Sequence, residues 1–364
     1  MPTIGRTRDE TIEILSIVPT QGPGGIIAPS CTAAISLAVD EINSGTGILG
    51  REINLTTLDG GREPHEVAAE VAAFLATGMV GAITGWHTSA VRRAVAEAVD
   101  ARVPYLYATD HEGLPDERPG VLLVGEHPDH QTVPAAAWMT RELGVRRWAV
   151  IGNDYIWPRR TARALRRSLP DPYDIIVEHY VPLGTTDFGD FLDDPALLLA
   201  DAVLILMVGA DTARFNRQFT ATGLPAVMPR LSPAVDENVL LSAGPSANAN
   251  LYVASSFFLD NKSAEGRSRR ARYHRHQGRF APVLTTFSNS TYEAIHLLNT
   301  LADTTGTLDV ETIIAAAHPG LALDGPATRR GFLGNQAVGP THLAMANGVD
   351  FDILCRLPAN PGRA

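Results

Sequence analysis

Short hydrophobic runs and longer amphipathic stretches alternate along most of the chain. The first run, residues 11–18, is rich in β-branched and aliphatic side chains and has the length of a strand. A glycine-rich loop at 19–29 follows, then a stretch at 31–42 with small and apolar residues at helical spacing, and a second strand-like run at 51–58. Strands that alternate with helices are typical of a parallel sheet covered on both faces. The pattern therefore predicts an α/β protein.

The alternation forms two similar series, one before residue 110 and one that begins near residue 131. Strand-like runs near 121–127, 251–258 and 327–340 predict three passages of the chain between two lobes. We therefore expect two doubly wound parallel-sheet lobes joined by three crossovers. The carboxyl ends of both sheets then face each other, which predicts a ligand cleft between the lobes. The predicted lobes consist of residues 1–125 plus 255–328 and of residues 126–254 plus 329–364.

Charge and composition narrow the function. The 364-residue chain carries 40 acidic and 30 basic side chains, a formal charge of −10, which disfavours contact with a phosphate backbone. Its two cysteines, Cys31 and Cys355, lie near opposite ends of the chain and lack metal-ligand spacing. No apolar run has the length that a membrane span needs. We expect no direct nucleic-acid binding, no metal or cofactor, and no membrane span.

The amino terminus bears on location. The segment MPTIGRTRDETIEILSIVPT has arginines and acids where an export signal has a basic start and an apolar core. We therefore expect a cytoplasmic protein. The alternative is an exported protein from which a signal peptide has been removed.

The common catalytic motifs are absent. The sequence has no G-x-G-x-x-G after a strand, no G-x-x-x-x-G-K-[ST], no G-x-S-x-G and no H-E-x-x-H. His127, Asp129 and His130 are residue types that bind metals, but a solvated crossover loop is the favoured interpretation. An enzyme with His87 as a base, oriented by Asp110 or Asp211, is the alternative to a binding protein. We expect a protein that is not an enzyme.

Three segments place polar and aromatic side chains directly after predicted strands. In GWHTS, the Ser89 hydroxyl and the backbone N–H groups at a helix start form a donor group for a carbonyl or carboxylate oxygen, or a plain N-cap. Tyr107 and Thr109 share one side of the next strand end because side chains alternate along a strand. Tyr155 and Trp157 follow a strand of the second lobe, where two rings exceed what a core requires, although we expect one of them to be structural.

These segments carry a family resemblance. The segments TAAISLAVDEIN, GWHTSAVRRAV, PYLYAT and above all IGNDYIWPR resemble the type I periplasmic-binding-protein fold. Within this fold they look most like the branch that contains the amide-binding regulator of the aliphatic amidase operon and the urea and short-chain amide receptors of ABC transporters. The similarity extends over about residues 10–355.

The resemblance implies a ligand held between the lobes by hydroxyls and aromatic rings, without covalent chemistry. Carried over by motif, the ligand-binding positions are Ser89, His87, Tyr107, Thr109, Tyr155, Trp157, Val208, and Ser232 or Pro233. His87 and Trp157 replace tyrosines of the regulator, and the larger indole should change the ligand size. Asp211 either faces the cleft, as an acceptor for an amide NH₂ or an ammonium group, or caps the helix that follows it, which we favour.

The resemblance also implies a function. We expect a non-enzymatic sensor that closes over a small amide, urea or a related metabolite. It would then signal to a protein partner, such as an antiterminator or another transcription regulator of an amidase or nitrile-degradation operon. The alternative is a solute-binding receptor of an ABC transporter for urea, amides or branched-chain amino acids. The exact ligand, the activating or repressing role and a homo-oligomeric state stay open.

Overall fold

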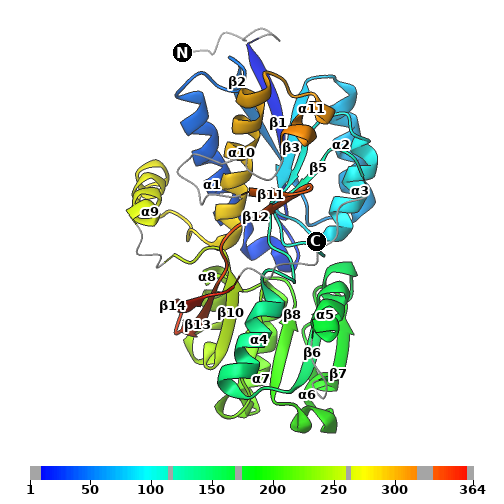
Figure 1. Ribbon diagram of the computed structural model, residues 1–364, viewed down its shortest axis with the longest axis vertical. Helices are drawn as coiled ribbons and strands as arrows, with labels where there is room; N and C mark the ends of the chain where they lie inside the picture. The colour runs from blue at the N-terminus through cyan, green and yellow to red at the C-terminus, as the bar shows by residue number, and fades with distance from the viewer. Residues whose placement is uncertain (1–9, 114–117, 169–173, 260–263, 318–330, 359–364) are drawn as a thin grey trace.

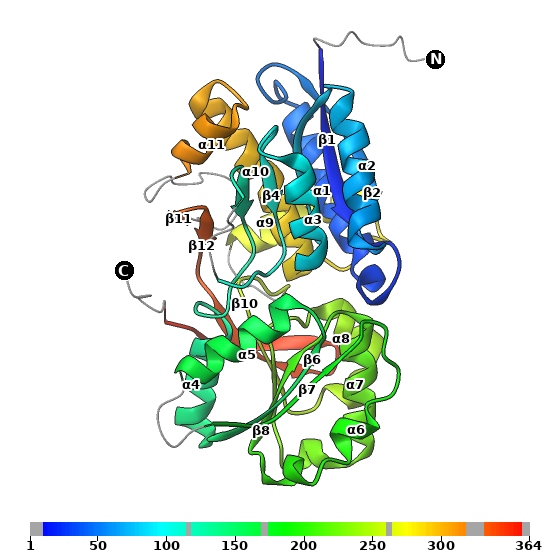
Figure 2. The same cartoon turned by 90° about the vertical axis from the view of Figure 1, so that its right-hand side faces the viewer.

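The computed structural model describes residues 10–113, 118–168, 174–259, 264–317 and 331–358. They form two α/β lobes stacked along the long axis of the molecule (Figure 1), and Figure 2 shows the same two lobes from the side. Each lobe is built on a mostly parallel sheet with helices on both faces. The predicted fold class, two doubly wound lobes joined by three crossovers, is confirmed.

The first lobe is built on five parallel strands in the order β2-β1-β3-β4-β5. Their bounds are β1 Thr11–Val18, β2 Glu52–Asp59, β3 Val80–Gly85, β4 Tyr105–Tyr107 and β5 Val121–Leu123. The central strand β1 is buried without interruption from Ile14 to Val18. A parallel strand covered on both faces needs an unbroken apolar run, because neither face meets water. This requirement explains the hydrophobic run at the start of the chain.

Two pairs of helices cover the two faces of this sheet. Ile14 packs in one hydrophobic cluster with α1 (Ala28–Asn43) and α10 (Thr286–Thr305). Ile17 points to the opposite face and packs in another cluster with α2 and α3. The remaining helical bounds of this lobe are η1 Pro23–Ile26, α2 Pro64–Ala76, α3 Ser89–Val99, α9 Ala264–Gln277 and α11 Val310–Ala316. Helix α10 comes from a late segment that returns to the first lobe, so the core joins distant parts of the sequence.

The second lobe repeats this plan with the strand order β7-β6-β8-β9-β10, continued by the antiparallel strands β13 and β14. The strand bounds are β6 Arg147–Asn153, β7 Asp174–Val181, β8 Ala202–Leu206, β9 Arg230–Ser232, β10 Leu251–Ser255, β13 His342–Asn347 and β14 Asp350–Arg356. Helices α4 and α5 pack on one face, and α7 and α8 on the other. The helical bounds are α4 Thr132–Leu143, α5 Ile156–Ser168, α6 Gly189–Leu192, η2 Pro195–Leu199, α7 Ala210–Ala221, η3 Leu224–Ala226, α8 Glu237–Ala243 and η4 Pro245–Asn248.

One predicted lobe boundary needs correction. Residues 329–364 were expected in the second lobe, but β11 (Gly331–Leu333) and β12 (Gln336–Val338) belong to the first sheet. Strand β12 lies parallel to β5, and Asn335 Nδ2 donates a hydrogen bond to Val121 O over 3.1 Å. The short hairpin thus supplies partners to an edge strand whose backbone groups would otherwise be unpaired. The third passage between the lobes therefore follows residue 338.

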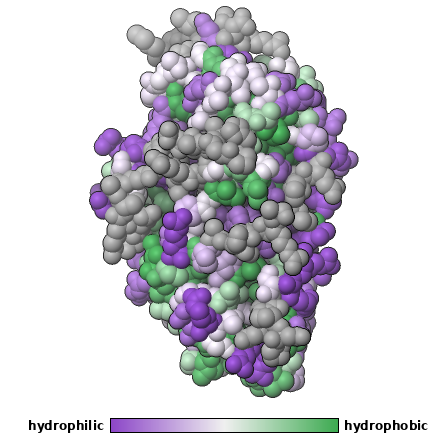
Figure 3. All heavy atoms as spheres, viewed as in Figure 1, coloured by the Kyte–Doolittle hydropathy of each residue, from purple (hydrophilic) through white to green (hydrophobic). Residues whose placement is uncertain are grey.

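On the face of the molecule in Figure 3, hydrophilic and hydrophobic residues are interspersed. Within the described ranges, no helix combines the length and the apolar character that a bilayer crossing requires.

Gly85 tests how closely the strands of the first sheet must approach each other. Its φ is +145°, and a Cβ atom there would lie 2.0 Å from Ile17 O on the neighbouring strand. We expect Gly85→Ala to lower the free energy of unfolding by about 2–3 kcal/mol or more, because backbone strain and a backbone clash add. Gly144→Ala is the control, since its φ is also positive but nothing lies within 4 Å. Equal losses in urea unfolding of both variants would contradict this explanation.

Candidate functional site

A small cleft lies where the two lobes meet. Its lining residues come from both lobes and, except for Phe287 on α10, follow or end strands or begin the helix after them. They are Trp86, Tyr107, Thr109, Asp110 and Phe287 from the first lobe and Tyr155, Trp157, Val208, Gly209 and Ala234 from the second. This is the geometry that two parallel sheets produce when their carboxyl ends face each other.

Aromatic rings form much of the cleft wall. The rings of Trp86 and Phe287 have centroids 5.1 Å apart, and those of Tyr155 and Trp157 lie 6.4 Å apart at an interplanar angle of 23°. Between these side chains there is room for little more than one water molecule. The rings around this space favour a flat or apolar surface on a molecule that enters it.

The lobes contact each other beside this cleft. Asn238 Nδ2 of the second lobe donates a hydrogen bond to Ser30 Oγ of the first over 3.0 Å. Gly209, which precedes α7, approaches η1 so closely that a Cβ atom there would lie 2.2 Å from Pro23 O. Glycine at this position thus allows the backbones of the two lobes to meet.

Polar groups of the first lobe are fixed at the cleft wall. Thr109 Oγ1 accepts a hydrogen bond from His87 N over 2.9 Å, and the Tyr107 hydroxyl donates to His87 O over 2.7 Å. Trp86 Nε1 is buried and has no hydrogen-bond partner in the described part of the chain. Thr109 and Trp86 can therefore direct hydrogen-bond donors at an acceptor atom of a solute.

Five of the predicted positions line the cleft: Tyr107, Thr109, Tyr155, Trp157 and Val208. His87 does not, and its prediction is corrected. Its ring is buried in the first lobe, with Nδ1 3.0 Å from Ile17 O and Nε2 2.5 Å from the Tyr105 hydroxyl. Burial lowers the pKa of His87 to about 3. The imidazole is thus a structural group of the sheet and not a base in the cleft.

Ser89 also lies outside the cleft lining. It is the first residue of α3, as predicted, but the side chain that caps this helix belongs to Thr88, which accepts from Val91 N. Ser89 Oγ is buried and has no hydrogen-bond partner among the described residues. Tyr107 lines the cleft wall, whereas Ser89 does not.

Asp211 and Ser232 do not line the cleft either. The favoured role of Asp211 as a helix cap is also wrong, because Asp211 is the second residue of α7 and Gly209 occupies the cap position. The Asp211 carboxylate is buried in the second lobe and accepts from Asn153 Nδ2 over 2.9 Å and from Gly184 N over 2.8 Å. Burial raises the pKa of Asp211, while these bonds act in the opposite direction. Ser232 Oγ donates to Ile205 O over 2.9 Å and so fixes the end of β9. Both side chains hold strand ends together instead of facing a ligand.

Half of the lining residues were not predicted as binding positions, namely Trp86, Asp110, Gly209, Ala234 and Phe287. Trp86 precedes His87 and Asp110 follows Thr109, so each adjoins a residue that was predicted. The strand ends were therefore predicted, but not which neighbouring side chains line the cleft. Phe287 comes from the start of α10 and gives no local signal, because only the tertiary fold brings it to the cleft.

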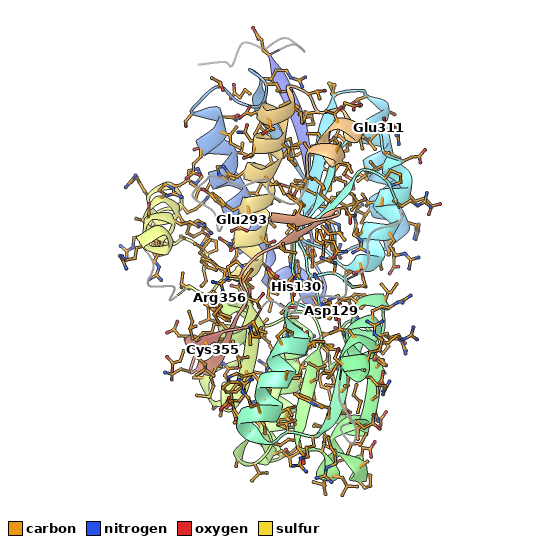
Figure 4. The ribbon with its side chains drawn as sticks, in the orientation of Figure 1. Asp129, His130, Glu293, Glu311, Cys355 and Arg356 are labelled. Atoms are coloured by element: carbon orange, nitrogen blue, oxygen red, sulfur yellow. The ribbon has the colours of Figure 1, made fainter. Side chains whose placement is uncertain are left out.

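Three histidines gather at the first crossover. The rings of His111 and His127 are 5.3 Å apart, and those of His127 and His130 are 4.1 Å apart. Figure 4 shows Asp129 and His130 at the junction of the two lobes. In the described ranges no group of three or more His, Cys, Asp or Glu residues is arranged to hold a metal ion. Burial, the largest cause, lowers the pKa of His127 to about 3 and also lowers that of His111.

With this geometry established, comparisons identify the class of protein. Two α/β lobes around a ligand cleft define a two-lobed binding-protein fold. Residues 11–350 match the family model described as periplasmic binding protein, and the chain belongs to this family.

Solved structures with this fold cover nearly the whole chain. The leucine-binding protein LivK from Thermotoga maritima has a TM-score of 0.85 at 19% identity and covers 96% of this chain and 99% of its own. The branched-chain amino acid transporter protein LivJ from Streptococcus pneumoniae, in complex with isoleucine, has a TM-score of 0.83 at 18% identity, with coverages of 96% and 99%. An ABC-transporter solute-binding protein from Rhodopseudomonas palustris HaA2, in complex with p-hydroxybenzoic acid, has a TM-score of 0.86 at 19% identity, with coverages of 97% and 98%.

The buried histidines predict a pH dependence of stability. In the unfolded chain a histidine has a pKa near 6.5. The folded pKa of His87 and His127 is about 3, so the unfolded state binds more protons between these values. Stability is therefore complete above the unfolded pKa and falls as the pH drops toward 3, by up to about 1.4 kcal/mol per pH unit for each excess proton.

We expect His127→Gln to flatten this slope in urea unfolding experiments between pH 7 and pH 5. The exposed His65→Gln is the control and should keep the slope of the wild type. A slope that is identical in wild type and His127→Gln would show that His127 is not buried in its neutral form.

Proposed function

We propose that this protein reversibly binds a small solute of the amide class, such as a short-chain amide or urea, between its lobes and releases it chemically unchanged. We propose further that it serves as the solute-binding receptor of an ABC transporter. The cleft carries this proposal, because aromatic and polar side chains from both lobes converge on one small space. A ligand that contacts both lobes favours the closed arrangement by its differential affinity for it.

The cleft chemistry supports an amide-class solute. Trp86 and Thr109 offer donors for a carbonyl oxygen, and the Asp110 carboxylate offers an acceptor for N–H groups. The rings of Tyr155 and Trp157 suit a planar group, which an amide or urea has. For a ligand of four to six heavy atoms, affinity is limited to about 1.5 kcal/mol per atom, so we expect dissociation constants of about micromolar or weaker.

The transport role rests on the related structures. Several proteins with this fold are described as solute-binding proteins of ABC transporters, and some were solved with a bound small molecule. Such a receptor would work outside the cytoplasm. Detection of the protein in the extracytoplasmic fraction of its native cells would support this role, and its confinement to the cytoplasm would contradict it.

A regulatory sensor is the second candidate, favoured by one observation. Five residues that the amide-regulator resemblance assigns to the ligand line the cleft: Tyr107, Thr109, Tyr155, Trp157 and Val208. In this role the closed protein would act on a partner such as an antiterminator from within the cytoplasm. Co-purification of a transcription regulator that is released or bound on addition of acetamide would favour the sensor over the receptor.

Trp157 tests the binding site itself. We expect Trp157→Ala to weaken amide binding by about tenfold or more, because the variant loses a ring that covers the solute. The measurement is calorimetric titration with acetamide, propionamide, urea, benzamide and leucine, after unfolding and refolding that removes any bound solute. Trp138→Ala, which removes a partly buried indole of α4 outside the cleft, should bind as the wild type does.

Two results would contradict the proposed function. If the refolded wild type binds none of the amides or urea, the amide class is wrong. If it binds an amide but Trp157→Ala leaves the affinity unchanged, the solute does not lie in this cleft.

A further inference from the structure

Asp110 is the one acidic residue among the described residues that line the cleft, and none of these lining residues is an arginine or a lysine. We propose that Asp110 determines specificity, because its carboxylate excludes solutes that carry a carboxylate and favours solutes that present N–H donors. This inference rests on the proposed function, since it concerns which solutes the same cleft accepts. In this inference Asp110 contacts the solute. In the enzyme alternative it would instead orient His87.

Hydrogen bonds from the first crossover hold Asp110 in place. Its Oδ1 accepts from Glu126 N over 3.2 Å, and its Oδ2 lies 3.3 Å from the donor Gln131 Nε2. Gln131 Nε2 also donates to Ala254 O over 2.9 Å, so the residue that holds Asp110 is itself anchored to the second lobe. The carboxylate is therefore a fixed charge at the wall and not a mobile surface group.

Arg92, a buried cation behind the wall, has an acidic partner of its own. Arg92 lies over the ring of Tyr107, with Cζ 4.9 Å from the ring centroid. Its Nη2 lies 2.9 Å from Glu112 Oε2, and both side chains are more than nine-tenths buried. The charges of Arg92 and Glu112 therefore compensate each other behind the ring.

The histidines of the crossover contribute no positive charge either. Burial lowers the pKa of His111, His127 and His130, so that they are neutral at pH 7. Among the described residues that line the cleft, Asp110 thus supplies the carboxylate that a bound solute would meet. In a cleft that excludes most water, such a charge acts on a solute with little screening.

The consequence for recognition follows from the sign of this charge. An N–H group of an amide or urea forms a charge-assisted hydrogen bond with a carboxylate. A solute carboxylate in the same place meets a like charge that water cannot screen. Related proteins of this fold were solved with benzoate and with 4-hydroxybenzoate, so the fold itself accepts acids. The restriction would come from this residue.

Isosteric pairs of amide and acid test the inference. We would titrate refolded protein at pH 7.5 with acetamide and acetate, propionamide and propionate, and benzamide and benzoate. For the wild type we expect each bound amide to bind at least about 100-fold more tightly than its acid. Asp110→Asn removes the charge at nearly constant shape, and we expect the amide-to-acid ratio to fall by about tenfold or more. Asp154→Asn, at an exposed carboxylate paired with Arg159, controls for net charge.

The outcomes separate this inference from the proposed function. Wild-type binding of an acid as tight as that of its amide overturns the role of Asp110, and this result does not depend on whether the variant folds. An equal loss of both solutes in Asp110→Asn also overturns it, because a purely structural residue moves both affinities together. If the wild type binds neither amides nor acids, the proposed function fails with it.

Discussion

The close parallel pairing of strands in the first sheet is the constraint on which the cleft depends. Ile17, Gly85, Tyr107 and Leu123 form one row across β1, β3, β4 and β5. The row ends β3, β4 and β5 and lies one residue before the end of β1. The residues that follow β3 and β4 therefore enter the cleft together. Because Gly85 has no side chain, β3 can approach the backbone of β1 closely. Trp86, the next residue, then lies at the cleft wall. The second sheet ends in the same way, which gives the cleft its two-sided aromatic lining.

Sequence patterns predicted the lobes because each strand is an apolar run of limited length followed by a helix. They also predicted which strand ends reach the cleft, as Tyr107, Thr109 and Trp157 show. They could not predict the direction of neighbouring side chains, since His87 is drawn into the sheet by Ile17 O and the Tyr105 hydroxyl. Phe287 and the β11–β12 hairpin were beyond local reasoning because contacts with distant segments alone determine where they pack.

The cleft combines little net charge with many rings. Charged groups around it are compensated, as in the pair of Arg92 and Glu112, or neutral, as in the buried histidines. Neutral polar solutes lose less hydration energy on entering such a site than ions do, because an isolated ion is costly to remove from water. The proposed amide-class solute agrees with this balance, and a single carboxylate on the wall would then suffice to discriminate among solutes of similar shape.

Gln131 joins two of the connections between the lobes. Its side chain belongs to the first crossover, yet its Nε2 donates to Ala254 O on β10, the strand that leads into the second crossover, and to Pro233 O after β9. Two connections that are far apart in the sequence are therefore fastened to each other where they join the second lobe, so that one glutamine side chain fixes how the two crossovers lie beside each other.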